Sequence, residues 1–217
     1  MKRQRSDALN TRLNLLEAAS EIFGNKGFWS ATHEEICSKA NANTAAINYH
    51  FGSKENLYIE AWKYSYKKSM EKHPPEGGAL PGDPVEKRMR GRILSFLQRI
   101  VDPETYDIDI MLKEMANPTG LLVEVMPATT EPVDRELRST IRELIGQGAS
   151  EYLIGFCYMS LISLCFGAMM LLRTINIDNT RMQPSSVIPA DLGVEKLADN
   201  IIRFAMAGIR SFRETSG

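Results

Sequence analysis

The residues best suited to chemistry lie close together, between Thr44 and Lys54. Thr44 and Asn48 carry groups that both donate and accept hydrogen bonds, and Tyr49, His50 and Lys54 carry donors. An asparagine amide can pair with the edge of adenine, whereas hydroxyl, imidazole and ammonium donors suit phosphate oxygens. This set of residues predicts contact with a nucleic acid rather than catalysis.

Two small residues, Ala45 and Ala46, follow Thr44 and would let the backbone approach a DNA groove, where an alanine methyl can meet a thymine methyl. Upstream, Thr32 and His33 stand at the start of another expected helix. The alternative interpretation is a short solvated helix of any helical domain. The residues that we predict to contact DNA are Thr32, His33, Thr44, Ala45, Ala46, Asn48, Tyr49, His50 and Lys54. The basic leader (Lys2, Arg3, Arg5 and Arg12) can contact phosphate or remain solvated.

The three cysteines do not have the spacing of a metal site. Cys37 is isolated, and Cys157 and Cys165 are eight residues apart with no histidine nearby, which is too far for one tetrahedral centre. We expect buried, inert thiols. The sequence also has no glycine-rich phosphate loop and no nucleophile–base constellation. We therefore expect no metal, no cofactor and no enzymatic activity.

Composition and charge favour an ordinary globular protein with a basic front end. Of 217 residues, 43% are hydrophobic and 24% charged, with a net charge of -1. Residues 1–72 hold 11 Lys and Arg against 8 Asp and Glu, a net charge of +3, while the remainder holds 15 against 19, a net charge of -4. This gradient suggests a small polyanion-binding module at the N-terminal end. The start has no apolar signal-peptide core, so we expect a cytoplasmic protein.

Helical elements must position the DNA-contacting residues. Apolar residues from Leu15 to Phe23 recur at spacings of three and four, which predicts a first helix that Gly27 ends. The Thr32–Glu35 pair predicts a capping box that starts a second helix at about 33–40. Asn41 can adopt the left-handed conformation of a tight turn.

Two further helices complete the N-terminal part. Asn43 can cap a helix at about 44–50, and Ser53 can cap one that runs to about Lys72. The offsets of helix, short turn and helix are those of a helix-turn-helix. The loop 73–82 is dense in Pro and Gly and predicts a linker.

The rest of the chain also has a helical pattern, so we predict an all-α fold. Asp83, Pro84 and Glu86 suggest a second capping box, and prolines predict breaks between the elements that follow. The helices that we expect there are 104–117, 119–126, 131–146, 150–174 and 192–213. The expected domains are a helix-turn-helix domain at 1–52, a connecting helix at 53–72, and a C-terminal domain at 73–217.

Residues 11–57 resemble the DNA-binding domain of TetR-family regulators. The matching positions include Phe23, Gly27 and Ile47, and two runs, Tyr49-His50-Phe51 and Ser53-Lys54-Glu55-Asn56-Leu57. Two positions depart from the pattern: Asn41 replaces the usual turn glycine, and Asn48 replaces a common tyrosine. Residues 113–119, with the two last helices, resemble the CecR/CerR-type subgroup.

The resemblance implies a homodimeric, sequence-specific transcriptional regulator with a palindromic operator, and we expect a repressor that a small effector releases. The C-terminal domain would bind the effector and form the dimer. An apolar or aromatic effector fits the candidate lining, although each of these residues also suits a core. The predicted lining residues are Phe96, Met111, Met115, Met126, Tyr158 and Met169.

The last two helices predict the dimer interface, because two such helices from each subunit can form a four-helix bundle. Both helices can instead remain inside one subunit. The residues predicted at the interface are Leu161, Leu164, Val194, Leu197, Ile201, Phe204 and Gly208.

A different class of protein is also compatible with one segment. Residues 152–172 carry no charge over 21 residues, which is long enough to span a bilayer. The alternative is therefore a membrane-anchored helical protein. Four small residues weaken it, because small residues also suit close packing between soluble helices: Gly155, Ser160, Ser163 and Gly167.

Overall fold

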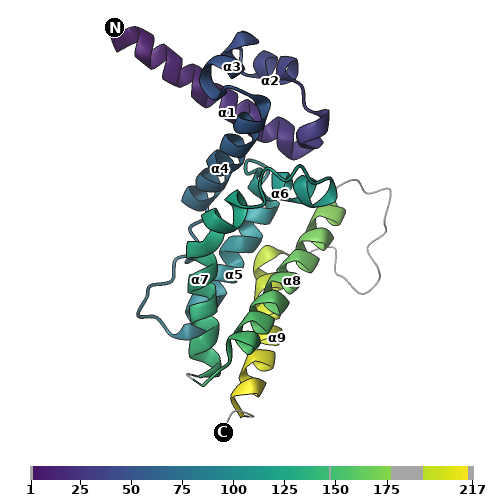
Figure 1. Cartoon of the computed structure of the whole chain (residues 1–217). Helices are drawn as coiled ribbons and strands as arrows, with labels where there is room; N and C mark the ends of the chain where they lie inside the picture. Colours follow the sequence, from purple (N-terminus) through teal and green to yellow (C-terminus); the bar gives the residue numbers. More distant parts are fainter. Residues whose placement is uncertain (1, 147, 177–192, 215–217) are drawn as a thin grey trace. The chain divides into compact units, whose positions relative to one another are not determined.

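The structure is a computed structural model that describes residues 2–146, 148–176 and 193–214. These residues form nine helices and no strand, as the all-α prediction requires (Figure 1). Contacts divide the chain into two compact units. Unit 1 comprises residues 1–72 and 103–130, and unit 2 comprises residues 73–102 and 131–217. Segment 103–130, which the sequence boundary at residue 73 placed with the C-terminal domain, therefore packs with the N-terminal helices.

Helix α1 (Lys2–Ser30) is interrupted near its end, as the glycine signal predicted. Gly27 has a φ of 76° and a ψ of 173°, which is not helical. A side chain at this positive φ would be strained, so glycine allows the chain to turn before Phe28. Upstream of the break, Leu15, Ala19 and Phe23 are fully buried and form the centre of the unit 1 core.

Helix α2 (His33–Lys39) begins at the predicted capping box. The Thr32 hydroxyl accepts a hydrogen bond from the Glu35 amide, and the Glu35 carboxylate accepts one from the Thr32 amide, both at 3.2 Å. The turn that follows uses Asn41 at a φ of 51°, which confirms the expected left-handed residue. Asparagine tolerates this conformation because its short side chain can hydrogen-bond locally.

Helix α3 (Ala45–Phe51) starts one residue later than expected. Asn43 Oδ1 accepts a hydrogen bond from the Ala45 amide at 2.9 Å and closes the turn, although Thr44 is the residue at the cap position. A helix of seven residues is not stable alone. Ile47 and Phe51 hold it by burying one face in the core.

Helix α4 (Lys54–Lys72) begins at the predicted serine cap, where Ser53 Oγ accepts from the Asn56 amide at 3.2 Å. Its side chains Tyr58 and Trp62 are among the largest in the unit 1 core. Burying side chains of this size stabilises the fold by roughly 1.5–3 kcal/mol each. The side-chain amide of Asn56 donates to the Phe51 carbonyl at 3.0 Å and so joins the start of α4 to the end of α3.

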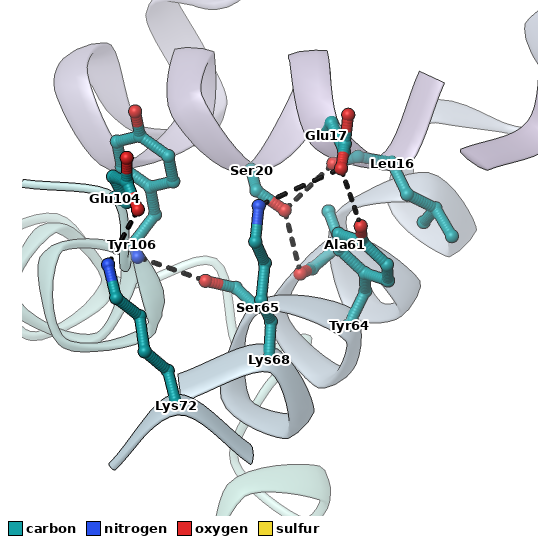
Figure 2. Close-up of polar contacts among 10 residues, drawn as sticks. All are labelled: Leu16, Glu17, Ser20, Ala61, Tyr64, Ser65, Lys68, Lys72, Glu104 and Tyr106. Atoms are coloured by element: carbon teal, nitrogen blue, oxygen red, sulfur yellow. Dashed lines mark hydrogen bonds and ion pairs between the residues drawn. The ribbon is translucent and has the colours of Figure 1, made fainter. Parts of the chain in front are cut away.

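Segment 103–130 adds helix α6 (Asp107–Ala116), which packs against α1 and α4. Polar contacts join its start to α4 (Figure 2). The Tyr106 amide donates to Ser65 Oγ at 3.0 Å, and Lys72 pairs with Glu104 at 2.6 Å. These contacts explain why the segment belongs to unit 1.

The proline signals after α6 were partly wrong. The expected helix at 119–126 does not form, because Gly120 has a φ of 79° and the chain turns there. Helix α7 (Val125–Ile145) contains both Pro127 and Pro132. Pro127 is in the first turn, where the missing N–H has no helical acceptor. The helix continues past Pro132, and its last turns are fixed by buried residues that include Ile141 and Leu144.

Unit 2 also contains α5 (Val85–Val101), α8 (Glu151–Asn176) and α9 (Val194–Glu214), with α5 packed against both α8 and α9. The predicted box at the start of α5 does not form. Pro84 is the cap residue and makes no side-chain cap bond, while the Asp83 carboxylate instead accepts from the Leu80 amide at 2.7 Å. Asp83 therefore closes the preceding loop rather than the helix.

Candidate nucleic-acid interface

Helix α3 has one buried face and one exposed face. Ile47 and Phe51 point into the core, while Thr44, Ala45 and Asn48 are exposed. Ala46 is half-buried against the same core. A short helix held by one apolar face and free on the other can enter the major groove of DNA with its first turn.

Tyr49 and His50 lie in the last turn of α3 and have different environments. Tyr49 is 80% exposed, and its ring meets that of His50 edge to face at 4.8 Å between centroids. His50 is half-buried, and desolvation, together with the nearby Arg12 charge, lowers the pKa of its imidazole. At neutral pH this histidine is therefore a neutral donor rather than an added positive charge.

Lys54, the first residue of α4, lies over an aromatic ring. Its ammonium is 4.5 Å from the centroid of Phe28. Burial lowers the pKa of this lysine, and the Glu55 carboxylate partly opposes that effect. Lys26 and Lys39 instead pair with acidic residues of their own unit, so their charges are already neutralised locally.

The remaining residues that were predicted to contact DNA differ in whether their polar groups are available. Thr32 and His33 are exposed, but the Thr32 hydroxyl is engaged in the capping box. Arg12 pairs with Glu60 at 3.2 Å and stacks 5.1 Å from the Phe51 ring. Arg12 therefore joins α1 to α3 and α4, and its guanidinium is already engaged within the protein. The side chains of Lys2, Arg3 and Arg5 lie outside the described part of the structure.

Sequence reasoning missed one exposed aromatic residue beside this surface. Trp29 lies in the last turn of α1 and is 61% exposed, with its ring edge-on to Phe28 at 5.2 Å between centroids. The signal was present in the sequence, since a tryptophan directly after the core residue Phe28 cannot share its direction on a helix.

A polar pocket of about 540 Å³ lies within unit 1, between α1, α4 and the start of segment 103–130. Its wall groups already bond to one another (Figure 2). Ser20 Oγ donates to the Ala61 carbonyl at 3.0 Å, Tyr64 donates to Glu17 at 2.9 Å, and Lys68 lies 3.7 Å from the same carboxylate. A wall satisfied in this way favours a structural junction.

The predicted effector-lining residues are divided between the two units. Met111, Met115 and Met126 belong to unit 1, whereas Phe96, Tyr158 and Met169 belong to unit 2. Met115 is exposed and Met169 is buried in the core. Neither the polar pocket of unit 1 nor a smaller one of about 130 Å³ beside α5 contains any of the six.

Unit 2 exposes apolar side chains along its last two helices. The exposed apolar residues there are Tyr152, Phe156, Met159, Met170 and Phe204. Those on α8 recur at spacings compatible with one helical stripe. Of the predicted interface residues, Leu161 (2% exposed) and Ile201 (7% exposed) are used by the subunit's own core, Leu164, Val194 and Leu197 are half-buried, and Phe204 and Gly208 are exposed.

The all-α fold and the exposed face of α3, the second helix of the helix-turn-helix, define a helix-turn-helix regulator. Comparisons with known proteins identify the family. Residues 15–61 match the bacterial regulatory proteins of the tetR family, and residues 85–209 match the C-terminal domain of the HTH-type transcriptional dual regulator CecR. The chain belongs to the TetR family of transcriptional regulators and has a C-terminal domain of the CecR type.

Curated relatives agree with this identification. The chain is 33% identical over 101 residues to a probable acrEF/envCD operon repressor of Escherichia coli K12. The matched region covers 46% of this chain and 44% of the relative. It is 30% identical over 147 residues to the dual regulator CecR of Shigella flexneri, and this match covers 63% of this chain and 66% of CecR. The matched regions thus span 44% of the first relative's length and 66% of the length of CecR.

Solved structures share the fold. A putative transcriptional regulator from Pseudomonas aeruginosa PAO1 is 19% identical, with a TM-score of 0.66 over 98% of this chain and 96% of the other. AibR, solved with isovaleryl coenzyme A and operator DNA, is 16% identical, with a TM-score of 0.67 over 89% of this chain and 97% of AibR.

The membrane-anchored alternative has no support from the comparisons. Residues 151–170 of α8 are long and apolar enough to cross a bilayer, but only by length and composition. An apolar helix of this kind is also what an interface between helices requires.

Proposed function

We propose that the protein is a cytoplasmic, dimeric repressor that binds a palindromic operator through α3 and is released by a small effector. The observation that carries the proposal is the division of α3 into two faces. Ile47 and Phe51 fix the helix to the core, and Thr44, Ala45 and Asn48 face outward. Side chains of this kind can read base edges in the major groove.

Phosphate contacts would position the helix on DNA without reading sequence. Tyr49 is the most exposed donor beside α3, and Lys54 brings a positive charge to the start of α4. Each phosphate that the protein neutralises releases counterions, so affinity should fall steeply with salt.

The dimer would form through the exposed apolar stripe of α8 and the adjoining surface of α9. Tyr152, Phe156 and Met159 leave one side of α8 open to water, and Phe204 does the same on α9. Soluble monomers rarely expose such a stripe, and two copies of the pair of helices would cover it as a four-helix bundle. A two-fold dimer requires operator half-sites related by inversion.

The effector would act by binding one conformation of the C-terminal domain better than another, since only differential affinity shifts such an equilibrium. The names of relatives support repression, and the bound coenzyme A ester of AibR shows that this fold accommodates an organic ligand. An apolar or aromatic effector remains our proposal for this chain, with Phe96, Tyr158 and Met169 as its candidates within unit 2.

Selection of bound duplexes from a random pool tests the proposal. We expect an inverted repeat whose affinity for the protein falls with rising salt. Recovery of no inverted repeat, or binding that does not depend on sequence, would contradict the proposed function. The selected sequence would also lead to the regulated genes and so to the class of effector.

A further inference from the structure

The two tryptophans of the chain have opposite environments, and only one of them contributes to the core. Trp62 is 2% exposed in unit 1, whereas Trp29 is 61% exposed at the end of α1. A tryptophan stabilises a fold through the area that it buries, and an exposed indole N–H can donate a hydrogen bond to a bound molecule. Packing alone therefore does not account for Trp29.

Trp29 and Lys54 share one aromatic neighbour. The ring of Phe28, which is nearly buried, meets the Trp29 ring edge to face at 5.2 Å and lies under the Lys54 ammonium at 4.5 Å. Both side chains therefore contact one ring of the unit 1 core. We call Trp29 and Lys54 the Phe28 patch.

The lysine of this patch differs from its neighbours in its partners. Within the described part of the chain Lys54 makes no ion pair, while Lys26 and Lys39 pair with Glu35 and Glu21. A lysine held over a ring keeps its ammonium hydrogens free to donate outward. Such a patch suits an anion that also accepts a hydrogen bond.

The patch lies beside the expected DNA surface. Lys54 begins α4 directly after α3 and its Gly52 turn, and Trp29 stands three residues before Thr32, the cap of α2. Helix α3 packs against both α2 and α4, so both helix starts belong to elements that border α3. The patch therefore continues the row of exposed donors that Tyr49 begins.

We propose that the Phe28 patch grips the phosphate backbone of the operator, with the Trp29 indole N–H donating to a phosphate oxygen and the Lys54 ammonium neutralising the charge. This inference rests on the proposed function and adds a positioning contact to it. The indole has only a donor and no acceptor, so the contact would secure the register of α3 on DNA without specifying a base.

The two members of the patch should respond differently to substitution. Trp29→Phe keeps the ring against Phe28 and removes only the N–H, so affinity should fall about tenfold on operator and on scrambled duplex alike, with an unchanged salt slope. Lys54→Gln should also weaken both duplexes, but the salt slope should become shallower by about one for each subunit. Val123→Ala, at an exposed apolar position of the same unit, is the matched control and should bind as the wild type does.

Fluorescence gives a readout that a structural role would not move. With only two tryptophans, the wild-type signal minus that of Trp29→Phe isolates Trp29, and Trp62 serves as the buried reference. Acrylamide, a neutral quencher, should reach Trp29 in the free protein. The selected duplex should shield Trp29, and scrambled duplex at low salt should do the same.

The outcomes separate the inference from the function on which it rests. If the wild type binds the selected duplex while Trp29→Phe binds equally well and Trp29 stays open to acrylamide, the patch does not touch DNA and only the inference fails. Shielding that depends on protein concentration without DNA would assign Trp29 to a protein contact instead. A wild-type protein that binds no duplex overturns both the inference and the function. Thermal melting of each variant confirms that the fold is retained.

Discussion

The hydroxyl of Tyr58 donates a hydrogen bond to the buried carboxylate of Glu114 over 3.0 Å and so joins α4 to α6. The same carboxylate accepts from the Thr119 amide, the Thr119 hydroxyl and the Gly120 amide, at 2.9–3.0 Å. Burial and the adjacent Glu114 charge raise the pKa of Tyr58, so this phenol stays protonated and donates. Glu114 thus closes the turn after α6 and attaches it to the core of the DNA-binding unit.

Removal of this carboxylate should destabilise unit 1. Glu114→Ala leaves the buried Tyr58 hydroxyl and the half-buried Thr119 donors without their acceptor, so we expect the free energy of unfolding to fall by about 2–4 kcal/mol. Tyr58→Phe loses one hydrogen bond and should cost about 1–1.5 kcal/mol. Denaturant titration of both variants and of the double variant measures these changes.

Thr119→Ser is the matched control for this prediction, because it keeps the hydroxyl that donates to Glu114. It should stay close to the wild type, while Thr119→Val should not. The double variant of Glu114 and Tyr58 should lose less than the two single variants together, since they share one bond. Strict additivity would mean that the observed bond contributes nothing to stability.

The sequence predicted the N-terminal elements well because their signals are local. The capping box at Thr32, the left-handed Asn41 and the serine cap at Ser53 each depend on atoms within three residues, and all three are present in the structure. The buried face of α3 could also be predicted, since Ile47 and Phe51 are spaced by one helical turn.

Signals that depend on distant partners were not readable in the same way. No local pattern indicates that Glu114 contacts Tyr58, which is 56 residues away, so residues 113–119 could be noted only as a family resemblance. Arg12 is of a residue type that commonly contacts phosphate, but in the structure its charge is paired with Glu60 on another helix. Proline was an unreliable boundary because its effect depends on position, as Pro127 in the first turn of α7 illustrates.

The thiols of the native protein should react slowly. Burial raises the pKa of Cys37 and of Cys157, and raises the pKa of Cys165 to about 12. Because the thiolate is the nucleophile and a raised pKa keeps the thiol protonated, little thiolate exists at mildly alkaline pH, and the reaction should accelerate only as pH rises further.

Alkylation with iodoacetamide, followed by mass spectrometry, tests this expectation. The native protein should be modified much more slowly than the same protein in guanidinium chloride, in which all three thiols are exposed. Rapid modification of any one cysteine in the native state would show a reactive thiol and reopen the question of a redox role.

Reading and positioning residues of the proposed interface should separate in binding assays. Thr44→Val keeps the shape of an exposed side chain and removes its hydroxyl, so it should cost about 1–3 kcal/mol on the operator and relax preference at one position. Asn48→Ala should behave in the same way at another position. Tyr49→Phe should instead weaken operator and scrambled duplex equally, since it loses a phosphate contact.

Selection from a random pool with each variant measures these preferences. Ser38→Ala, an exposed position on α2 outside the predicted contacts, is the control and should bind normally. Equal loss on operator and scrambled duplex for Thr44→Val would place the reading face elsewhere on the unit.

The dimer prediction rests on Phe204, which is 70% exposed on α9 while its neighbour along the helix, Ile201, is buried in the subunit. In the proposed four-helix bundle Phe204 would be covered by the partner. A glutamate there would bury a charge without a counterion and weaken association by several kcal/mol. The isolated subunit should still fold, because the substituted side chain lies outside its core.

Light scattering and operator binding on the same sample measure the effect. Phe204→Glu should shift the protein from dimer to monomer at micromolar concentration, and operator affinity should collapse although no DNA contact is altered, since one half-site supplies only part of the binding energy. Arg203→Glu, exposed one residue earlier, should remain dimeric, and Ile201→Glu should lose the fold itself. A Phe204→Glu protein that stays dimeric and binds its operator as the wild type does would move the interface away from this face of α9.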